Sequence, residues 1–186
     1  MTIEMPSRYV YKRYHIDTNR INARQNIDTM NKLEAWKQNG VIDIEMSLVA
    51  MDEASSGSSV SRKKKALSHI FSYTESDGQN DLDRMEKIKQ AIFPMGCKNQ
   101  NQLNDVEIVF NAGKYHLPLI TDDGASRNQP GGILGAQSQL RNMGIIVLRA
   151  EEAILEVETA IKLRDEMARR IHQEYGYELP DWVDKD

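Results

Sequence analysis

The sequence predicts an α/β protein, a three-layer α/β/α domain built around a central, mainly parallel sheet. Short β-branched or apolar segments alternate with longer segments whose apolar residues recur every three or four positions. Turn-forming residues and helix caps separate the two kinds of segment. Such alternation is typical of a parallel sheet with helices on both faces. The 186 residues correspond to one domain, and no internal repeat is visible.

The N-terminal part is expected to alternate between strand and helix. Its predicted elements are a strand over residues 9–16, a helix over 22–39, a strand over 41–45 and a helix over 47–55. Asp17, Thr18 and Asn19 break the first strand and can cap the helix that follows. Gly40 ends the first helix, because glycine readily takes the left-handed conformation found just beyond helices. Ser47 is expected to cap the second helix through its hydroxyl.

Residues 55–100 are expected to form a helical insertion within a single domain that spans residues 1–186. The insertion opens with a Ser- and Gly-rich stretch, SSGSSVS, which is typical of flexible connections. A basic helix over residues 62–73 and a second helix over residues 81–93 should follow. Pro94 closes the second helix, since proline cannot donate the backbone hydrogen bond that a helix needs.

Beyond the insertion, helices and strands alternate again. The predicted elements are helices over residues 104–116, 133–143 and 151–175, and strands over 117–121 and 145–148. The last helix carries an apolar stripe made by Ala153, Ile154, Val157, Ala160, Ile161, Met167, Ala168 and Ile171. The stripe predicts that one face of this helix is packed in the core or against a second copy of the chain.

The composition excludes several classes of protein. Hydrophobic residues make up 40% of the chain and charged residues 28%, with a net charge of −4, so bulk charge does not hold it to nucleic acid. No apolar run approaches the ~18 residues of a membrane-spanning helix, and no signal-peptide pattern is apparent. The single cysteine, Cys97, excludes an internal disulfide and a cysteine-rich zinc site. We therefore expect a cytoplasmic protein.

Acidic residues stand at or near the ends of the predicted strands. They are Asp17 after the first strand, Asp122 and Asp123 after the strand over 117–121, Asp105 near the start of the preceding helix, and Asp52 and Glu53 inside an apolar helix. Ligands of parallel sheets bind beyond the carboxyl ends of the strands. Carboxylates gathered there would raise each other's pKa unless a divalent cation bound them. Hard oxygen ligands suit Mg²⁺ or Mn²⁺, metals that promote phosphodiester cleavage.

Each acid also has a purely structural interpretation. An Asp after a strand often forms a turn or caps a helix, which applies to Asp17. Asp105 can stabilise the first turn of its helix through the helix dipole. Asp52 and Glu53 can simply be solvated. The order of the acids along the chain is therefore more informative than any one of them.

That order resembles the PIN-domain family of metal-dependent nucleases. Residues 14–21, YHIDTNRI, look like the family's opening strand, which ends in Asp followed by a polar residue and Asn. Residues 104–124 are similar to its Asp, helix, short strand and Thr-x-Asp, and residues 143–154 to its closing strand and helix. Residues 42–54 match the segment with the second acid more loosely. The resemblance implies a PIN-like, Rossmann-like fold and covers most of the chain outside residues 55–100.

The resemblance implies catalytic and metal-binding roles for four acids. They are Asp17, Glu53 with Asp52 as a rival, Asp105, and Asp123 with Asp122 as a supporting neighbour. Asn19 and Thr121 occupy polar positions that support the metal site in the family, and the implied cofactor is Mg²⁺ or Mn²⁺. Two departures from the family stand out. The insertion is longer than in compact members, and the loop after Asp123 lacks a frequent aromatic residue.

A run of basic residues follows the second acidic position. Arg62, Lys63, Lys64 and Lys65 are candidates to hold an RNA backbone through phosphate contacts, and Arg127 is a weaker one. The alternative is that the run is a solvated helix start.

The preferred function is that of a metal-dependent endoribonuclease acting on RNA. The family includes toxins of toxin–antitoxin pairs, so an antitoxin is a further candidate partner. The apolar stripe of the last helix makes a second copy of the chain another. Two other classes stay open. One is a non-catalytic nucleic-acid or protein-binding module on the same fold, which metal-dependent cleavage would exclude. The other is a different Mg²⁺-dependent phosphoesterase, which would favour Asp-x-Asp after the first strand, where this chain has Asp17-Thr18-Asn19.

Overall fold

The computed structural model describes residues 4–72, 76–124 and 131–186 and contains a five-stranded sheet whose neighbouring strands are all parallel. The strands are β1 (Arg13–Ile16), β2 (Asp43–Ser47), β3 (Ile70–Ser72), β4 (Leu119–Ile120) and β5 (Val147–Leu148), in the order β3-β2-β1-β4-β5. The α/β class and the parallel sheet predicted from the sequence are confirmed, and the architecture is consistent with a PIN-like fold.

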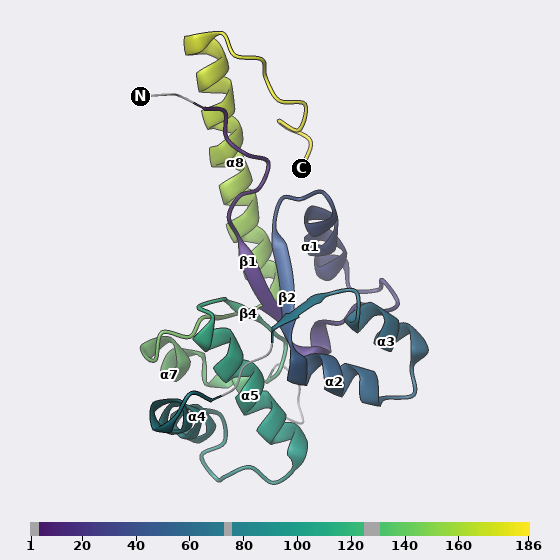
Figure 1. Cartoon of the computed structure of the whole chain (residues 1–186), viewed down its shortest axis with the longest axis vertical. Coiled ribbons are helices and arrows are strands. Elements are labelled where there is room, and N and C mark those ends of the chain that lie inside the picture. The colour runs from purple at the N-terminus through teal and green to yellow at the C-terminus, as the bar shows by residue number, and fades with distance from the viewer. Residues whose placement is uncertain (1–3, 73–75, 125–130) are drawn as a thin grey trace.

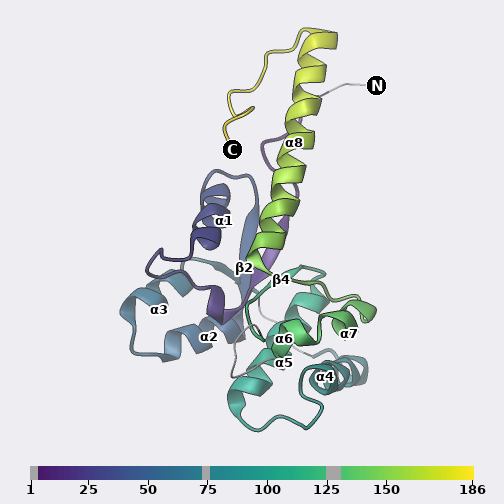
Figure 2. The same cartoon turned by 180° about the vertical axis from the view of Figure 1, so that it is seen from behind.

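Helices cover both faces of this sheet (Figures 1 and 2). The helices are α1 (Asp28–Gln38), α2 (Leu48–Ser56), α3 (Val60–Ala66), α4 (Gln79–Ile92), α5 (Gln100–Lys114), α6 (Gly132–Gly135), α7 (Gln137–Asn142) and α8 (Ala150–Tyr175), with a 3₁₀ turn, η1 (Thr18–Arg20). α1 and α8 pack together against one face, and α5 packs with α2 and α4 against the other.

The central strand β1 is buried from both sides. Tyr14 and Ile16 are fully buried, and the Tyr14 hydroxyl donates a hydrogen bond to Glu156 of α8. His15 points to the opposite face, where its ring lies beside that of Tyr115 at the end of α5. Alternation of side chains along a strand accounts for this division, so Tyr14 lies on the side of α8 and His15 on the side of α5.

The order of the strands creates a switch point between β1 and β4. From β1 the chain runs to β2 and β3 on one side, and it returns to β4 and β5 on the other. At the carboxyl end of this pair, the backbone N–H of Asp17 donates to the carbonyl of Ile120 over 3.0 Å. Asp17 and Thr121 therefore follow directly on neighbouring strands, at the position where open α/β sheets bind their ligands.

The helix expected over residues 62–73 is wrong in its second half. Helix α3 ends at Ala66, and the chain then enters the sheet as β3, which pairs with β2. The lysine-rich part of this segment favours a helix, whereas the Ile-Phe pair that follows it can form either a helix or a strand. Pairing with the edge of β2 decides between the two, and that edge is supplied by residues far away in sequence.

Three other boundaries differ from the expected ones. The helix expected over 22–39 begins only at Asp28, because Asn22 accepts a hydrogen bond from the backbone of Ile27 and Gln25 has a φ of +53°. The strand expected over 9–16 is regular only over Arg13–Ile16. The helix expected over 133–143 is split at Ala136 into α6 and α7.

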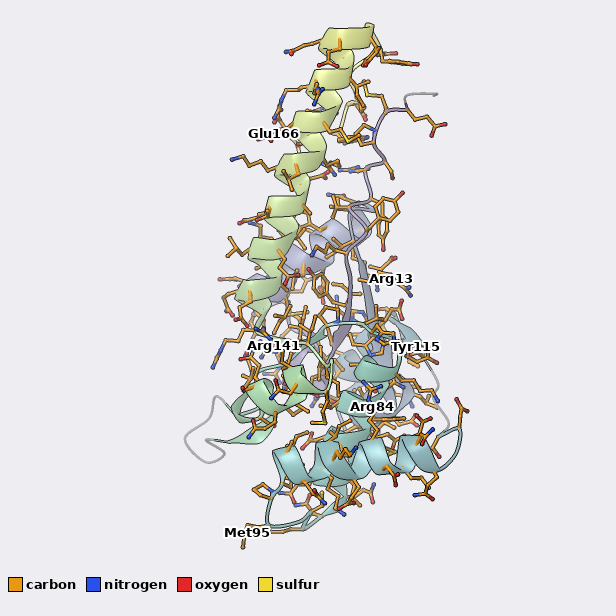
Figure 3. The ribbon with its side chains drawn as sticks, turned by 90° about the vertical axis from the view of Figure 1, so that its left-hand side faces the viewer. Arg13, Arg84, Met95, Tyr115, Arg141 and Glu166 are labelled. Atoms are coloured by element: carbon orange, nitrogen blue, oxygen red, sulfur yellow. The ribbon has the colours of Figure 1, made fainter. Side chains whose placement is uncertain are left out.

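Helix α8 extends well beyond the sheet. Its 26 residues span about 39 Å, and the free end is flanked by the N-terminal segment and the C-terminal tail (Figure 1). Figure 3 shows Glu166 on this extension, at the opposite end of the molecule from Met95. The predicted stripe fails at Met167, which is 54% exposed. Arg164 and Asp165 are buried there instead, paired with each other at 2.7 Å, while Arg164 stacks on Trp182.

Across the described ranges, no helix has both the length and the apolar character needed to cross a membrane.

Candidate active site

Asp17 lies at the centre of the candidate site. It caps η1 directly after β1, and its side chain is almost completely buried. Its carboxylate accepts hydrogen bonds from the backbone N–H of Thr18, from Nδ2 of Asn19 and from Oγ1 of Thr121, each over 2.6 Å. The capping interpretation of Asp17 is therefore confirmed. The capping bond engages Oδ1, and the two side-chain donors share Oδ2.

The environment of Asp17 raises the pKa of its carboxyl group to about 6. Burial is the largest cause, and the charges of Asp123 and Glu53 add to it. The hydrogen bonds from Thr121 and Thr18 act in the opposite direction because they stabilise the charged form. The carboxyl group of Asp17 is therefore harder to ionise than a free one, in spite of its three hydrogen-bond donors.

Thr121 and Asn19 join the ends of β4 and β1. The fully buried Thr121 hydroxyl also accepts hydrogen bonds from Nδ2 of Asn19 over 3.1 Å and from the backbone N–H of Asp123 over 2.9 Å. Asn19 in turn accepts from the backbone N–H of Asp122 over 3.2 Å. These bonds fix the two polar residues around Asp17, and the supporting role at a metal site that the resemblance implies for them stays a prediction.

Asp52 and Glu53 have different surroundings on α2. Glu53 is half-buried, and its Oε2 accepts a hydrogen bond from the hydroxyl of Thr18 over 3.0 Å. Asp52 is exposed. Consecutive helix residues point about 100° apart, so only one of the pair turns toward Asp17. Thr18 is a contact that the sequence reasoning did not anticipate; its position between the first acid and Asn19 was the only available signal.

The side chains of Asp122 and Asp123 also point in different directions. Asp122 turns outward and forms an ion pair with Arg20 at 2.6 Å. Asp123 turns inward, where its Oδ2 accepts a hydrogen bond from the backbone N–H of Ile133 over 2.8 Å. This contact needs glycine at position 132, which has a φ of +49° and where a Cβ atom would lie 2.5 Å from the Asp123 carboxylate.

Asp105 approaches the same place from α5. It lies in the second turn of that helix rather than at its first residues, because α5 begins at Gln100, and it is half-buried. The pKa of Asp105 is raised to about 8, first by burial and then by the negative charges of Asp17, Asp123 and Glu53. The structure thus brings the four predicted acids, from four separate segments, into one shared electrostatic environment.

The carboxylate oxygens of this cluster are suitable ligands for Mg²⁺ or Mn²⁺, but the carboxylates lie too far apart to coordinate one cation together. Carboxylate oxygens from four segments are the donors that these hard cations prefer. The raised pKa values of Asp17 and Asp105 come first from burial and then from neighbouring negative charge, and a cation would compensate that charge. Among the described residues, no group of three or more His, Cys, Asp or Glu side chains converges closely enough to hold a metal as it stands. The carboxylates would have to draw together on binding.

The basic run lies partly beside this cluster. Arg62 donates from Nη2 to the backbone carbonyl of Thr18 over 2.9 Å, so it borders the site. Lys63 and Lys64 are exposed on α3. Lys65 turns away and pairs with Glu34 of α1 at 2.6 Å. Arg127 lies outside the described residues.

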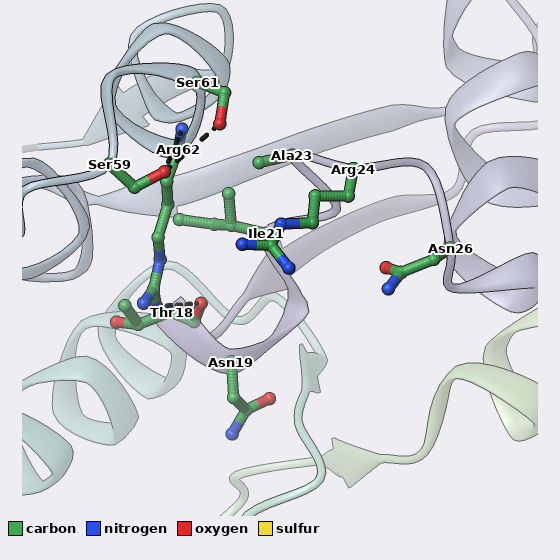
Figure 4. Close-up of a pocket in the computed structure, with 9 residues that line it drawn as sticks. All are labelled: Thr18, Asn19, Ile21, Ala23, Arg24, Asn26, Ser59, Ser61 and Arg62. Atoms are coloured by element: carbon green, nitrogen blue, oxygen red, sulfur yellow. Dashed lines mark hydrogen bonds between the residues drawn. The ribbon is translucent and has the colours of Figure 1, made fainter.

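A pocket of about 480 Å³ opens next to the acids (Figure 4). Its lining consists of Thr18, Asn19, Ile21, Ala23, Arg24, Asn26, Ser59, Ser61 and Arg62. We call it the Arg24–Arg62 pocket. Thr18 and Asn19 belong both to its wall and to the hydrogen-bond network of the acids. Arg24 was missed by sequence reasoning, since it lies within a segment expected to be helical and no pattern distinguishes it.

Comparison with known proteins gives a likeness in fold only. No model of a protein family matches the chain, and no curated protein sequence matches it. One similar structure is VapBC2 from Rickettsia felis bound to a DNA fragment from its promoter, at 15% identity over 74% of this chain and 98% of that chain, with a TM-score of 0.45. Another is FitAB bound to the IR36 DNA fragment, at 14% identity over 74% of this chain and 94% of that chain, with a TM-score of 0.44.

Proposed function

We propose that this protein is a metal-dependent endoribonuclease whose site is formed by Asp17, Glu53, Asp105 and Asp123. The observation that carries the proposal is the gathering of these four acids around the switch point of a parallel sheet. RNA as the substrate follows from the resemblance of the motifs to the PIN-domain family.

Within this proposal, the four carboxylates hold Mg²⁺ or Mn²⁺. Such a cation, when bound, lowers the pKa of water and offsets the charge of a phosphodiester, which is the chemistry that hydrolysis requires. Asp17 is held in place by Thr121 and Asn19, so the other carboxylates would move toward it when the metal binds. The hydroxyl of Thr18 donates to Glu53 and orients it in the same way.

The substrate would lie across the edge of the sheet. The guanidinium of Arg62 borders the acids through Thr18. It would contact a non-bridging phosphate oxygen and so offset charge that develops during cleavage. The exposed Lys63 and Lys64 would add attraction for the backbone from further away. An antitoxin partner stays a prediction from the sequence resemblance.

Cleavage of labelled single-stranded RNA tests the proposal. The wild type should cleave in Mg²⁺ or Mn²⁺ and stop in excess chelator, and Asp17→Asn should lose at least 100-fold in rate, in line with the typical loss of a group acting on the reacting charge. Asp52→Asn is the matched control, because it removes an acid from the same helix on its exposed side. Circular dichroism should show both variants folded.

Three outcomes would overturn the assignment. Full activity in Asp17→Asn would remove Asp17 from the site. Binding of RNA without cleavage in either metal would favour a binding module, and hydrolysis of p-nitrophenyl phosphate without action on RNA would favour a different phosphoesterase.

A further inference from the structure

We propose that the Arg24–Arg62 pocket is a subsite for one unpaired nucleotide of the RNA strand, adjacent to the phosphodiester on which the acids act. This inference rests on the proposed ribonuclease function and adds to it the form of the substrate, a single strand with one base turned out of the stack.

The charge of the pocket favours an anion. Arg24 makes no ion pair or hydrogen bond with any described residue, and the guanidinium of Arg62 donates, within the described ranges, only to the backbone carbonyl of Thr18. By contrast, Arg20, which lies close to Arg24 in sequence, is paired with Asp122. Two guanidinium groups that line one pocket without a carboxylate partner in the described ranges are suited to phosphate, which they can bind in a bidentate manner.

The shape and lining of the pocket suit a nucleotide rather than a bare phosphate. Its volume of about 480 Å³ lies within the range of small-molecule sites. Ile21 and Ala23 give it an apolar part against which a base can pack, and Asn26, whose amide has no partner among the described side chains, offers hydrogen bonds to a base edge or sugar. Figure 4 shows Arg24 reaching inward from one side while Arg62 runs along the other to Thr18.

The position of the pocket connects it to the chemistry. Thr18 and Asn19 form its boundary with the acids, through hydrogen bonds to Glu53 and Asp17. A nucleotide in the pocket would therefore have its neighbouring phosphate over the carboxylates. A base can enter only when it is unpaired, since a base within a duplex is held in its stack.

Fluorescence anisotropy with a labelled 12-nucleotide RNA, in chelator so that no cleavage occurs, tests the phosphate contact. Arg24→Ala should weaken binding about tenfold and reduce the slope of log Kd against log salt by about 0.7, the loss of one phosphate contact on a single strand. Arg24→Lys should restore the slope. Arg170→Ala is the control, because it removes an arginine that is paired with Glu174 on the extension of α8.

The base contact is tested with an abasic strand of the same length and charge. Wild type should bind RNA about fivefold more tightly than the abasic strand, a difference of ~1 kcal/mol. Ser61→Trp, which places a large side chain at the exposed rim of the pocket, should abolish this preference. When the same strand is paired in a duplex, neither protein should distinguish the intact strand from the abasic one.

The results separate this inference from the function on which it rests. Equal affinities and salt slopes in Arg24→Ala and Arg170→Ala would overturn the subsite even if wild type cleaves RNA. An unchanged preference for RNA over the abasic strand in Ser61→Trp would also overturn it. If binding depends on Arg24 and Ser61→Trp removes the base preference, yet wild type cleaves nothing, the subsite stands and the proposed ribonuclease activity fails.

Discussion

The hydroxyl of Thr121 donates a hydrogen bond to Oδ2 of Asp17 over 2.6 Å, and this contact joins residues 104 positions apart at the ends of β4 and β1. Both side chains are buried, so water cannot replace the bond if it is removed. Thr121 lowers the pKa of Asp17 against the effect of burial. The threonine therefore acts on both the stability of the sheet and the charge of the candidate site.

Thr121→Val should expose this double role. The substitution keeps the shape but leaves a buried carboxylate with one donor fewer, which should cost about 1–3 kcal/mol of unfolding free energy in urea titrations. The pKa of Asp17 should rise further, so the acidic limb of the cleavage profile should move to higher pH. Thr121→Ser, which restores the hydroxyl, should recover both. A pH profile identical to that of wild type would show that Thr121 serves packing alone.

The raised pKa of Asp105 should make the free energy of unfolding depend on pH. The pKa of Asp105 is raised to about 8 in the folded protein, against ~3.9 in an unfolded chain. The folded state therefore holds more protons than the unfolded state between about pH 4 and pH 8, and the free energy of unfolding should fall as pH rises through this range. His15 and His69, whose pKa values burial lowers to about 4, act in the opposite sense only below about pH 6.5. The slope from Asp105 is clearest above that value.

Asp105→Asn should flatten this slope in chelator and raise the melting temperature at about pH 8 by a few degrees, or ~1 kcal/mol after allowance for its partial exposure. Mn²⁺ should raise the melting temperature of wild type with concentration, and that of Asp105→Asn less. Glu166→Gln, on the extension of α8, should behave as wild type throughout. If Asp105→Asn melts at a lower temperature than wild type in chelator and responds to Mn²⁺ as wild type does, Asp105 contributes only to the helix and is not a metal ligand.

The two acids of α2 should respond in opposite ways to loss of charge. Glu53→Gln should abolish RNA cleavage, because Glu53 is the one that contacts Thr18 and turns toward Asp17. Asp52→Asn should leave the rate within about twofold of wild type, since surface substitutions away from such contacts have small effects. Rates measured side by side at saturating Mn²⁺ decide the matter, and the reverse pattern would move the ligand to Asp52.

Gly132→Ala should damage the position of Asp123. A Cβ atom there would lie 2.5 Å from the Asp123 carboxylate and 2.6 Å from the backbone nitrogen of Gly124, and the φ of +49° disfavours alanine. We expect a loss of about 1–3 kcal/mol in stability and a larger loss in cleavage. Gly131→Ala is the matched control, because a Cβ atom at Gly131 would meet nothing within 4 Å. Equal behaviour of the two variants would show that Asp123 tolerates displacement.

Features that depend on neighbouring residues could be read from the sequence. The Ser47 hydroxyl caps α2 by accepting from the backbone N–H of Ala50, and Gly40 has a φ of +71° just after α1, as expected. Asp17 follows β1 and caps the next turn. Helix caps and apolar periodicities depend on residues a few positions apart, so they form whatever the tertiary surroundings of the segment. The α/β class and the parallel sheet follow from their order.

The outcome changes where two distant segments meet. Residues 70–72 form the strand β3 because they pair with the edge of β2. Lys65 points away from the candidate site because it forms an ion pair with Glu34 of α1. Arg24 entered the pocket wall because a turn, held by Asn22, replaced the expected start of a helix. β2 lies 25 positions before β3 and Glu34 lies 31 positions before Lys65, so no local propensity encodes these two contacts.

The sequence by itself determined the alternation of strands and helices, and with it the edge of the sheet at which Asp17, Thr121 and Asp123 lie. Only the tertiary structure decided which of two adjacent acids turns inward, with Glu53 bonded to Thr18 and Asp122 drawn outward to Arg20. The physical reason is one of direction. Sequence spacing places a residue on an element, but the orientation of its carboxylate depends on donors that other segments bring within about 3 Å.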